Sequence, residues 1–355
     1  MKTIRVHEYG SPDVLRLEDV ADPLAGEGEV LIDVEGAAVN PIDWKILSGS
    51  MKAFIPLPLP YTPGVEVAGT IAAIGKGVSG FAVGDKVFGF IGLVGGYATK
   101  AVVSADRLAH RPRSLSALQA SGVAVAALTA WQALHEHAGI KAGQRVLIHG
   151  AAGGVGSMAV QIARHAGATV IATASIGNHG YLKKIGSNQV IDYRSQAFED
   201  VVADADIVLD LIGGETQLRS WKVLKRGGVL VSPVSAPDAA LATVHGVSAK
   251  NFATRPDGRQ LTAIAEMFDA GQLSVEVEVF PISQVKQAVE KSMAGHTRGK
   301  VVLNHWPMRL ARENIRSDVM SDRLLFDCYT DFFRCLTRCL NPSNTSTSTA
   351  SQIGM

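Results

Sequence analysis

The chain has 355 residues and a mass of 37.4 kDa, which predicts about two domains rather than one. Its 47% share of hydrophobic residues suffices for packed cores and excludes global disorder. With 34 Lys and Arg against 33 Asp and Glu, neither nucleic acid nor an acidic membrane surface is a predicted partner. The longest apolar stretch, near residues 123–134, is too short to span a bilayer, and MKTIRVHEYG lacks the apolar core of a secretory signal. We therefore expect a cytoplasmic protein.

Residues 1–118 read as a compact, partly barrel-like β domain. Short apolar runs such as EVLIDVEGAAV and VEVAGTIAAIG alternate with Gly and Pro, and Gly84-Asp85 predicts a tight turn between strands. The segment IPLPLPYTPG is rich in proline, which predicts an extended surface loop. Tyr61 lies in this loop, where packing within the loop is a more economical role than facing a cleft.

Residues 119–275 have the pattern of a parallel sheet covered by helices on both faces. Ser116 is a predicted N-cap for one helix that continues to residue 138. Strands at RVLIHG, TVIATAS, QVIDY, ADIVLDLIG and GGVLVSP then alternate with helical segments. Residues 276–306 add a helix and the strand KVVLNHW, and we expect them to return to the first domain.

Residues 307–355 form an atypical C-terminal extension. Its first part could form an amphipathic helix that binds a partner, although a loosely packed extension is the simpler interpretation, and its low-complexity end is expected to be partly disordered. All three cysteines, Cys328, Cys335 and Cys339, lie here. Their spacing matches no zinc or redox pair, so we interpret them as reduced thiols and expect no thiolate metal site.

A glycine-rich turn joins the strand RVLIHG to the next helix. This strand–turn–helix arrangement is a variant of the dinucleotide-binding motif, in which glycine lets the backbone approach a diphosphate and the N–H groups of the helix start hold its charge. A glycine turn alone would fit a structural role equally well, but the flanking elements favour a cofactor site. The predicted residues are Gly150, Gly153, Gly154, Val155 and Gly156.

The segment after the second strand of this region indicates which nicotinamide cofactor binds. An NAD site would place Asp or Glu there to bind the ribose hydroxyls, whereas this chain has Ser175, Asn178 and His179. Their hydroxyl, amide and imidazole donors suit a 2′-phosphate, which predicts NADPH. Tyr193 could add a phenol donor, or it could be a half-buried aromatic residue at a strand end.

From residue 1 to about 306 the chain resembles the zinc-independent medium-chain dehydrogenases/reductases, in particular the NADPH-dependent quinone oxidoreductase branch. The resemblance implies an α/β protein with a GroES-like β-rich catalytic domain and an inserted doubly wound Rossmann domain, with the active site in the cleft between them. It also implies a homodimer paired through the edge strands of the Rossmann sheets. The pieces that carry it are GSPDVLRLEDV, NPIDWK, PGVEVAG, GDKVFGF, the Gly150 turn, IDYR, RPDG and GHTRGKVVL.

Two departures from related patterns matter. Zinc-dependent relatives have a Cys early in the catalytic domain and a GHE motif later, where this chain has Asn40 and Gly64-Val65-Glu66, so no catalytic zinc is expected. Relatives often place Lys or Arg directly after the second Rossmann strand, where this chain has Ile176-Gly177. Either the affinity for NADPH is lower than usual, or another basic residue such as Lys183 or Lys184 reaches the 2′-phosphate, although solvated helix residues are the simpler interpretation of both lysines.

Without zinc, hydride transfer to an electron-poor conjugated acceptor is the favoured reaction, because such acceptors need little activation. By resemblance, Asn40 lies beside the nicotinamide and could donate a hydrogen bond to the developing enolate oxygen. Asp43 and Lys45 follow in the same loop and are either catalytic or a surface ion pair. Thr129 matches a position near the nicotinamide, with helix packing as its alternative role.

The predicted protein is a zinc-independent, NADPH-dependent reductase of a quinone or an α,β-unsaturated carbonyl compound. Two other functions stay open at this point. One is an enoyl thioester reductase, for which a basic rim would be needed to bind a phosphorylated carrier. The other is a non-enzymatic NADPH-binding sensor or structural protein, which would bind cofactor without turnover.

Overall fold

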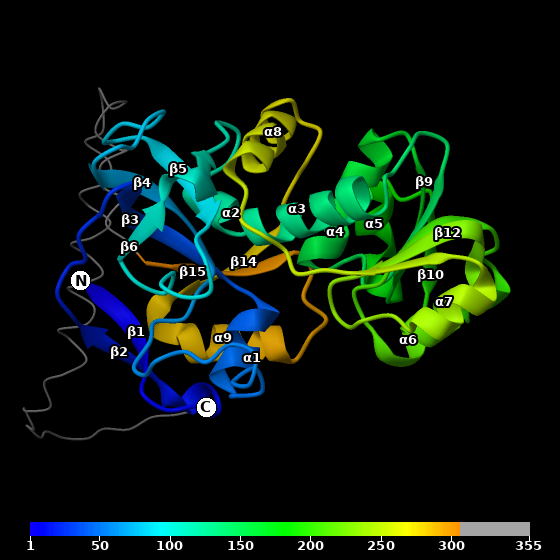
Figure 1. The fold of residues 1–355 in the computed structure, drawn as a ribbon, viewed down its shortest axis with the longest axis horizontal. Coiled ribbons are helices and arrows are strands. Elements are labelled where there is room, and N and C mark those ends of the chain that lie inside the picture. Colours follow the sequence, from blue (N-terminus) through cyan, green and yellow to red (C-terminus); the bar gives the residue numbers. More distant parts are fainter. Residues whose placement is uncertain (306–355) are drawn as a thin grey trace, which may run out of the picture. The chain divides into compact units, whose positions relative to one another are not determined.

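The computed structural model describes residues 1–305 (Figure 1). The first of its sheets is formed by the β-rich part of the chain. The strand order is β14-β15-β3-β4-β5-β7, with β6 also paired to β3, and a separate β1–β2 hairpin lies nearby. The strands are β1 (Lys2–Val6), β2 (Leu15–Asp19), β3 (Glu29–Val39), β4 (Glu66–Ile74), β5 (Lys86–Phe90), β6 (Lys100–Ser104), β7 (Leu108–His110), β14 (Val277–Pro281) and β15 (Lys300–Asn304).

The second sheet is six-stranded and entirely parallel, in the order β10-β9-β8-β11-β12-β13. Its strands are β8 (Arg145–Ile148), β9 (Thr169–Ala174), β10 (Gln189–Asp192), β11 (Ala205–Leu209), β12 (Leu224–Ser232) and β13 (Ser248–Asn251). The helices α4 (Gly154–His165), α5 (His179–Ile185), α6 (Gly214–Ser220) and α7 (Ala239–His245) connect them. The predicted fold class, a GroES-like domain with an inserted Rossmann sheet, is confirmed.

The chain returns to the first sheet at its described C-terminal end. After α8 (Gly258–Asp269), β14 pairs with β15, and β15 pairs antiparallel with β3. Helix α9 (Val285–Met293) connects β14 to β15. This return brings residues near position 300 beside residues near position 40. The domain boundaries drawn from sequence stay predictions, and those concerning residues 307–355 lie outside the described residues.

Two local predictions differ from the structure. The helix expected from Ser116 to residue 138 is divided into α2 (Ala117–Ser121), α3 (Ala124–Trp131) and a π-helical turn at Gln132–His137. Gly122 ends α2, and a Cβ atom there would lie 3.1 Å from Lys300 Cβ, so the break accommodates β15. The segment expected as a loop around Asp43 is helix α1 (Pro41–Leu47), with Asn40 as its N-cap and Pro41 in its first turn.

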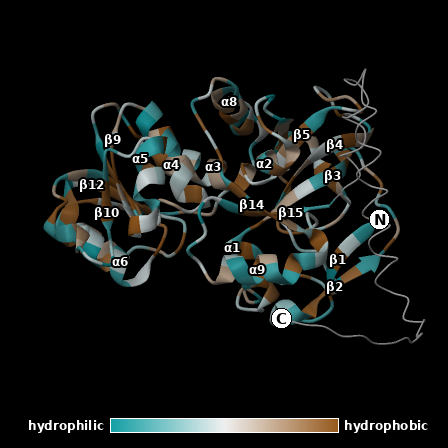
Figure 2. Ribbon diagram, turned by 180° about the vertical axis from the view of Figure 1, so that it is seen from behind, coloured by the Kyte–Doolittle hydropathy of each residue, from teal (hydrophilic) through white to brown (hydrophobic). Residues whose placement is uncertain are grey.

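A shared hydrophobic core joins the two sheets. Helices α3 and α4 lie between them (Figure 1), and the core around α3 includes Val65 and Phe88 from the first sheet and Val146 and Ile148 from the second. Hydrophobic residues follow the strands, whereas hydrophilic residues lie on outer helices such as α9 (Figure 2). The continuous core holds the edges of the two sheets in a defined relation, which positions the site between them.

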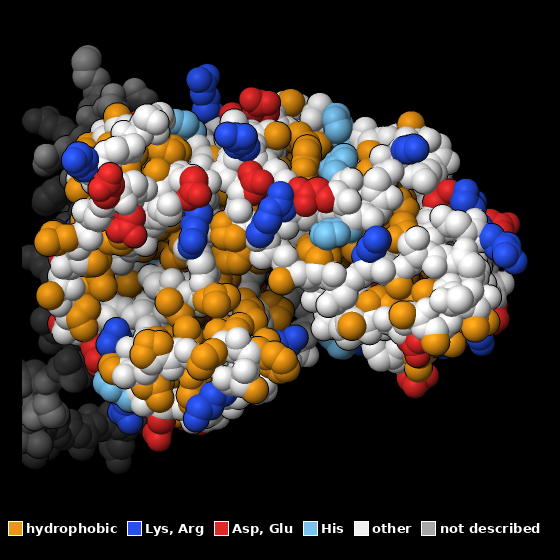
Figure 3. Space-filling model, in the orientation of Figure 1, with side chains coloured by type: hydrophobic (Ala, Val, Ile, Leu, Met, Phe, Trp, Pro, Cys, Tyr) orange, Lys and Arg blue, Asp and Glu red, His pale blue; other side chains and the backbone are white. Residues whose placement is uncertain are grey.

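The surface of the described part carries mixed charge. On the face drawn in Figure 3, Lys and Arg side chains are interspersed with Asp and Glu. Among residues 1–305, no helix is both long and apolar enough to cross a bilayer. On the face drawn, the interspersed charges agree with the balanced composition of the sequence.

Candidate active site

The glycine-rich turn between β8 and α4 has the geometry of a phosphate cradle. Gly150 has a positive φ of 65°, which glycine adopts without strain. A Cβ atom on Gly156 would overlap the carbonyl oxygen of Gly150 and lie 2.6 Å from Ala151 Cα, so only glycine fits. Gly153 is the N-cap of the twelve-residue helix α4 and provides no capping side chain, which leaves room at the helix start for an anion.

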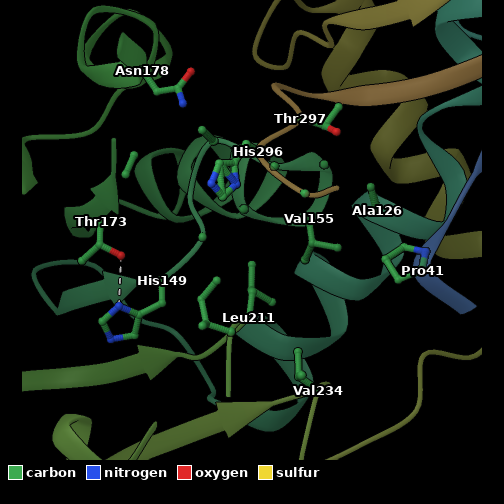
Figure 4. A pocket seen from close by; sticks show the side chains of 18 of the residues that line it. Pro41, Ala126, His149, Val155, Thr173, Asn178, Leu211, Val234, His296 and Thr297 are labelled. Atoms are coloured by element: carbon green, nitrogen blue, oxygen red, sulfur yellow. Dashed lines mark hydrogen bonds between the residues drawn. The ribbon is translucent and has the colours of Figure 1, made fainter. Parts of the chain in front are cut away.

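A cavity of about 670 Å³ extends from this turn toward α1. In Figure 4, Asn178 and Thr173 lie at one end of it, and Pro41 and Ala126 lie at the other. Its volume and its elongated course suit a dinucleotide, whose diphosphate would face the glycine turn in the middle. The residues present therefore fit a nicotinamide cofactor.

The cavity brings together most of the residues singled out from the sequence. Those that line it are Asn40, Gly150, Gly153, Gly154, Val155, Gly156, Ser175, Asn178 and Tyr193. Four others are not among its lining residues, namely Asp43, Lys45, Thr129 and His179. Thr129 instead donates to the Val125 carbonyl at 2.6 Å and contacts Thr254, which matches its alternative role in helix packing. The roles assigned to all thirteen residues stay predictions.

At the α1 end of the cavity, Asn40, Glu66 and Lys300 form a buried polar cluster. The Lys300 ammonium donates to Asn40 Oδ1 at 2.6 Å and to Glu66 Oε1 at 2.7 Å. Asn40 Nδ2 donates to Glu66 Oε1 at 2.9 Å, and the Val125 amide donates to Glu66 Oε2 at 2.7 Å. The Glu66 carboxylate is fully buried, and these partners supply the hydrogen bonds that its burial requires.

Lys300 was not predicted as a site residue, although it lies in the segment GHTRGKVVL. Lys300 begins β15 and is separated by more than 230 residues from both of its partners. The available signal was a lysine directly before an apolar strand expected to return to the first domain. A lysine at such a position reads as solvent-exposed until the pairing of β15 with β3 is known.

Asp43 lies behind this cluster. Its Oδ2 accepts from the backbone N–H group of Asn40 at 2.7 Å, as in a capping box, and from the Tyr97 hydroxyl at 3.0 Å. Its Oδ1 is buried without a hydrogen-bond partner. Burial raises the pKa of Asp43 to about 7, against the lowering effect of these two hydrogen bonds. The side chain therefore fixes the start of α1, and with it the position of Asn40.

His149, at the end of β8, is a second residue that sequence reasoning missed. Its imidazole contacts Thr173 Oγ1 and Ser220 Oγ, each at 3.0 Å, and lines the cavity (Figure 4). Burial lowers the pKa of His149 to about 4, so it is neutral near pH 7. Both ring nitrogens already have hydroxyl partners, so His149 offers shape to a ligand, but no charge.

Arg298, in the segment before β15, contacts Asn178 at the other end of the cavity but is not itself a lining residue. Its guanidinium donates to Asn178 Oδ1 at 2.9 Å and to the Gly177 carbonyl at 2.8 Å, and lies over the Tyr181 ring. Its side chain is 44% exposed, so donor groups remain accessible to a ligand. Lys183 and Lys184, which the sequence suggested for this place, are exposed and, like Arg298, are not among the lining residues. What distinguishes Arg298 is its hydrogen bond to the lining residue Asn178.

Comparison with known proteins identifies the family. Residues 26–113 match the alcohol dehydrogenase GroES-like domain, and residues 185–303 match the zinc-binding dehydrogenase family. A chloroplastic quinone oxidoreductase of Triphysaria versicolor is 32% identical over 85% of this chain and 98% of its own. The chain belongs to the quinone oxidoreductase branch of the medium-chain dehydrogenase/reductase superfamily.

Other members of this superfamily agree in sequence and fold. The 2-methylene-furan-3-one reductase of Solanum lycopersicum is 35% identical over 86% of this chain and 80% of its own. The quinone oxidoreductase structure from Coxiella burnetii is 33% identical, with a TM-score of 0.79 over 86% of this chain and 99% of its own. The Escherichia coli quinone oxidoreductase, solved in complex with NADPH, is 26% identical, with a TM-score of 0.79 over 86% of this chain and 100% of its own.

The name of one matched family includes zinc, and the donor set of this chain does not fit that ion. The positions of the Cys and His residues expected in zinc-dependent relatives hold Asn40 and Val65, and the remaining carboxylate, Glu66, is already paired with the Lys300 ammonium. A dication in this place would be repelled by that ammonium. Across residues 1–305, no three His, Cys, Asp or Glu side chains are grouped to hold a metal.

Proposed function

We propose that this protein is a zinc-independent oxidoreductase that uses NADPH to reduce a quinone or an α,β-unsaturated carbonyl compound. The observation that carries the proposal is the single cavity that connects a dinucleotide cradle to a buried Asn40–Glu66–Lys300 cluster. The names of the relatives, quinone oxidoreductases and a furanone reductase, support the same chemistry.

Different residues along the cavity would bind the cofactor and orient the acceptor. When bound, NADPH would supply the hydride for the reduction. The glycine turn and the start of α4 would hold the diphosphate, while Pro41, Ala126 and Val155 form an apolar wall that limits water at the reacting end. The polar cluster beside this wall would orient the acceptor carbonyl. Positioning of this kind suffices for an acceptor that is already electron-poor.

The proposal predicts turnover without metal. Protein stripped of metal by a chelator should oxidise NADPH in the presence of an o-quinone or a 2-alkenal, because no step depends on a Lewis acid. Initial rates at 340 nm, with and without added zinc, measure this, with NADH as the comparison cofactor. Loss of activity on chelation and its return with zinc would contradict the proposal. Saturable NADPH binding with no turnover of either acceptor would favour a sensor instead.

Arg298 supports the preference for NADPH over NADH. The end of β9 lacks the carboxylate that would bind ribose hydroxyls, and the Arg298 guanidinium lies against Gly177 and Asn178 at this same place. Ser175 and Tyr193 line the cavity nearby and add hydroxyl groups. A guanidinium held over a ring and beside hydroxyl donors is well suited to a phosphate monoester. We infer that the 2′-phosphate binds here.

Arg298→Ala is expected to reduce kcat/KM for NADPH by about 10- to 100-fold, the range of one charge-assisted hydrogen bond, and to leave NADH little affected. Arg298→Lys should retain part of the preference. Lys183→Ala, which removes an exposed cation of α5, serves as the matched control and should behave like the wild type. Equal losses for both cofactors in Arg298→Ala would show that Arg298 has only a structural role.

A homodimer and a cytoplasmic location complete this proposal. The strands β10 and β13 lie at the two edges of the parallel sheet, and the resemblance implies pairing through such edge strands. Most residues of β13 are exposed, which is compatible with a reversible, polar contact between two subunits.

A further inference from the structure

The Lys300 ammonium is held at the reacting end of the cavity by two oxygen atoms. Lys300 lines the cavity together with Asn40, and its side chain is 7% exposed. Its Nζ atom lies 2.6 Å from Asn40 Oδ1 and 2.7 Å from Glu66 Oε1. An ammonium has three N–H donors, and these contacts use two of them. Within residues 1–305 the third N–H group has no acceptor at hydrogen-bond distance, so it is available to a ligand.

The same contacts remove Asn40 from the available donors. The two hydrogen atoms of its amide have acceptors at Glu66 Oε1, at 2.9 Å, and at the Ala38 carbonyl, at 3.3 Å. Its Oδ1 atom receives the Lys300 ammonium. The hydrogen bond that sequence reasoning assigned to Asn40 would therefore require the cluster to break. Lys300 can donate to an acceptor oxygen with the cluster intact.

The Lys300 ammonium lies beside positions that differ from those of zinc-dependent relatives. It contacts Asn40 and Glu66, which stand where the sequence resemblance places the early Cys and the GHE motif of zinc-dependent relatives. One fixed positive charge thus lies beside Asn40, the position where those relatives are expected to have the early Cys. The Glu66 carboxylate, which also accepts from the Val125 amide, holds that charge in place.

Resting on the proposed function, we propose that Lys300 is the catalytic group that donates a hydrogen bond and positive charge to the carbonyl oxygen of the acceptor. When bound, the reduced nicotinamide would supply a hydride, a hydrogen atom with its bonding electron pair, to the acceptor carbon. The π electron pair of the acceptor moves onto the carbonyl oxygen, where the Lys300 N–H group stabilises the negative charge. A proton from solvent then adds to the resulting enolate and completes the reduction, so Lys300 ends the cycle unchanged.

The cofactor diphosphate is the rival ligand for this ammonium. The aliphatic part of Lys300 passes close to the glycine turn, because a Cβ atom on Gly154 would lie 2.5 Å from Lys300 Cδ. The charged end lies farther along, against Asn40 and Glu66, which favours the acceptor over the diphosphate. Measurements of cofactor affinity separate the two ligands.

The test compares wild type with Glu66→Gln/Lys300→Met. The double variant is preferred because Lys300→Met alone would leave the Glu66 carboxylate buried without its cation. Lys300→Arg, which keeps the charge, is the conservative variant. Lys100→Met removes a cation that pairs with Asp33 outside the cavity lining and is the matched control. Urea unfolding of each variant confirms that it is folded before the site is probed.

Three quantities are measured for each protein. They are NADPH affinity by fluorescence, kcat/KM for a 2-alkenal, and the pKa of 4-nitrophenol bound to the NADP⁺-loaded protein by absorbance. The phenolate oxygen imitates the oxyanion of the reduced acceptor. In wild type, the pKa of bound 4-nitrophenol should fall by about one unit or more relative to the double variant. The double variant should also lose about 100- to 1000-fold in kcat/KM, as expected for one lost oxyanion donor, with NADPH affinity within about threefold of wild type.

Each other outcome has a definite meaning. A tenfold or larger loss of NADPH affinity, with the 4-nitrophenol pKa unchanged, would assign Lys300 to the diphosphate and overturn the proposal. Equal 4-nitrophenol pKa values in wild type and the double variant would also overturn it. If wild type reduces neither acceptor but lowers the 4-nitrophenol pKa through Lys300, the proposed function fails while the oxyanion site stands.

Discussion

Gly156→Ala is expected to weaken NADPH binding by on the order of 100-fold, about 3 kcal/mol. The added Cβ atom would overlap the Gly150 carbonyl oxygen and lie 2.6 Å from Ala151 Cα and 2.8 Å from the Ala151 carbonyl carbon. All of these are backbone atoms, so the strain cannot be relieved by rotating a side chain. The glycine turn must move away from the start of α4, and the N–H groups that would face the diphosphate move with it.

Fluorescence titration with NADPH measures the affinity, and urea unfolding shows whether α4 still packs. Gly180→Ala is the matched control, because a Cβ atom there meets nothing within 4 Å and the residue lies in helix α5. That variant should bind NADPH as wild type does and gain about 0.5–1 kcal/mol in stability. Normal NADPH binding by Gly156→Ala would show that this turn does not hold the diphosphate.

The glycine turn was predictable because local signals define it. A buried strand, a run of glycines and an apolar helix follow one another within about twenty residues, and the structure places β8, the turn and α4 there. The apolar run EVLIDVEGAAV, one of those that indicated a β domain, is strand β3, and Ser116 caps α2 as expected. In each case the physical cause, alternation of apolar residues or a capping hydroxyl, acts over a few neighbouring positions.

The polar cluster was not predictable for the opposite reason. Lys300 meets Asn40 and Glu66 only because β15 returns to pair with β3, and Arg298 reaches Asn178 across 120 residues of chain. A buried lysine or arginine has no local sequence signature that separates it from an exposed one. The sequence could therefore locate the glycine turn but not the contacts of Lys300 and Arg298.

Asp43→Asn is expected to remove a pH-dependent part of the stability. The Asp43 carboxyl has a reference pKa of 3.8 when unfolded and a pKa of about 7 in the folded protein, raised by burial. The folded state therefore binds this proton more tightly than the unfolded state does. Its contribution to stability is complete below about pH 4 and is lost as the pH rises through 7. Asparagine carries no titrating proton, and its side-chain oxygen still offers an acceptor to the backbone N–H group of Asn40 and to the Tyr97 hydroxyl.

The free energy of unfolding of wild type, relative to Asp43→Asn, should fall by about 4 kcal/mol between pH 4 and pH 8. Urea unfolding at several pH values measures this difference, in which the contributions of other titrating groups largely cancel. Tyr97→Phe removes a hydrogen bond that lowers the pKa of Asp43, so it should extend the fall to higher pH. A difference that does not vary with pH would mean that Asp43 is ionised throughout, and that the start of α1 holds a buried charge beside the reacting end of the cavity.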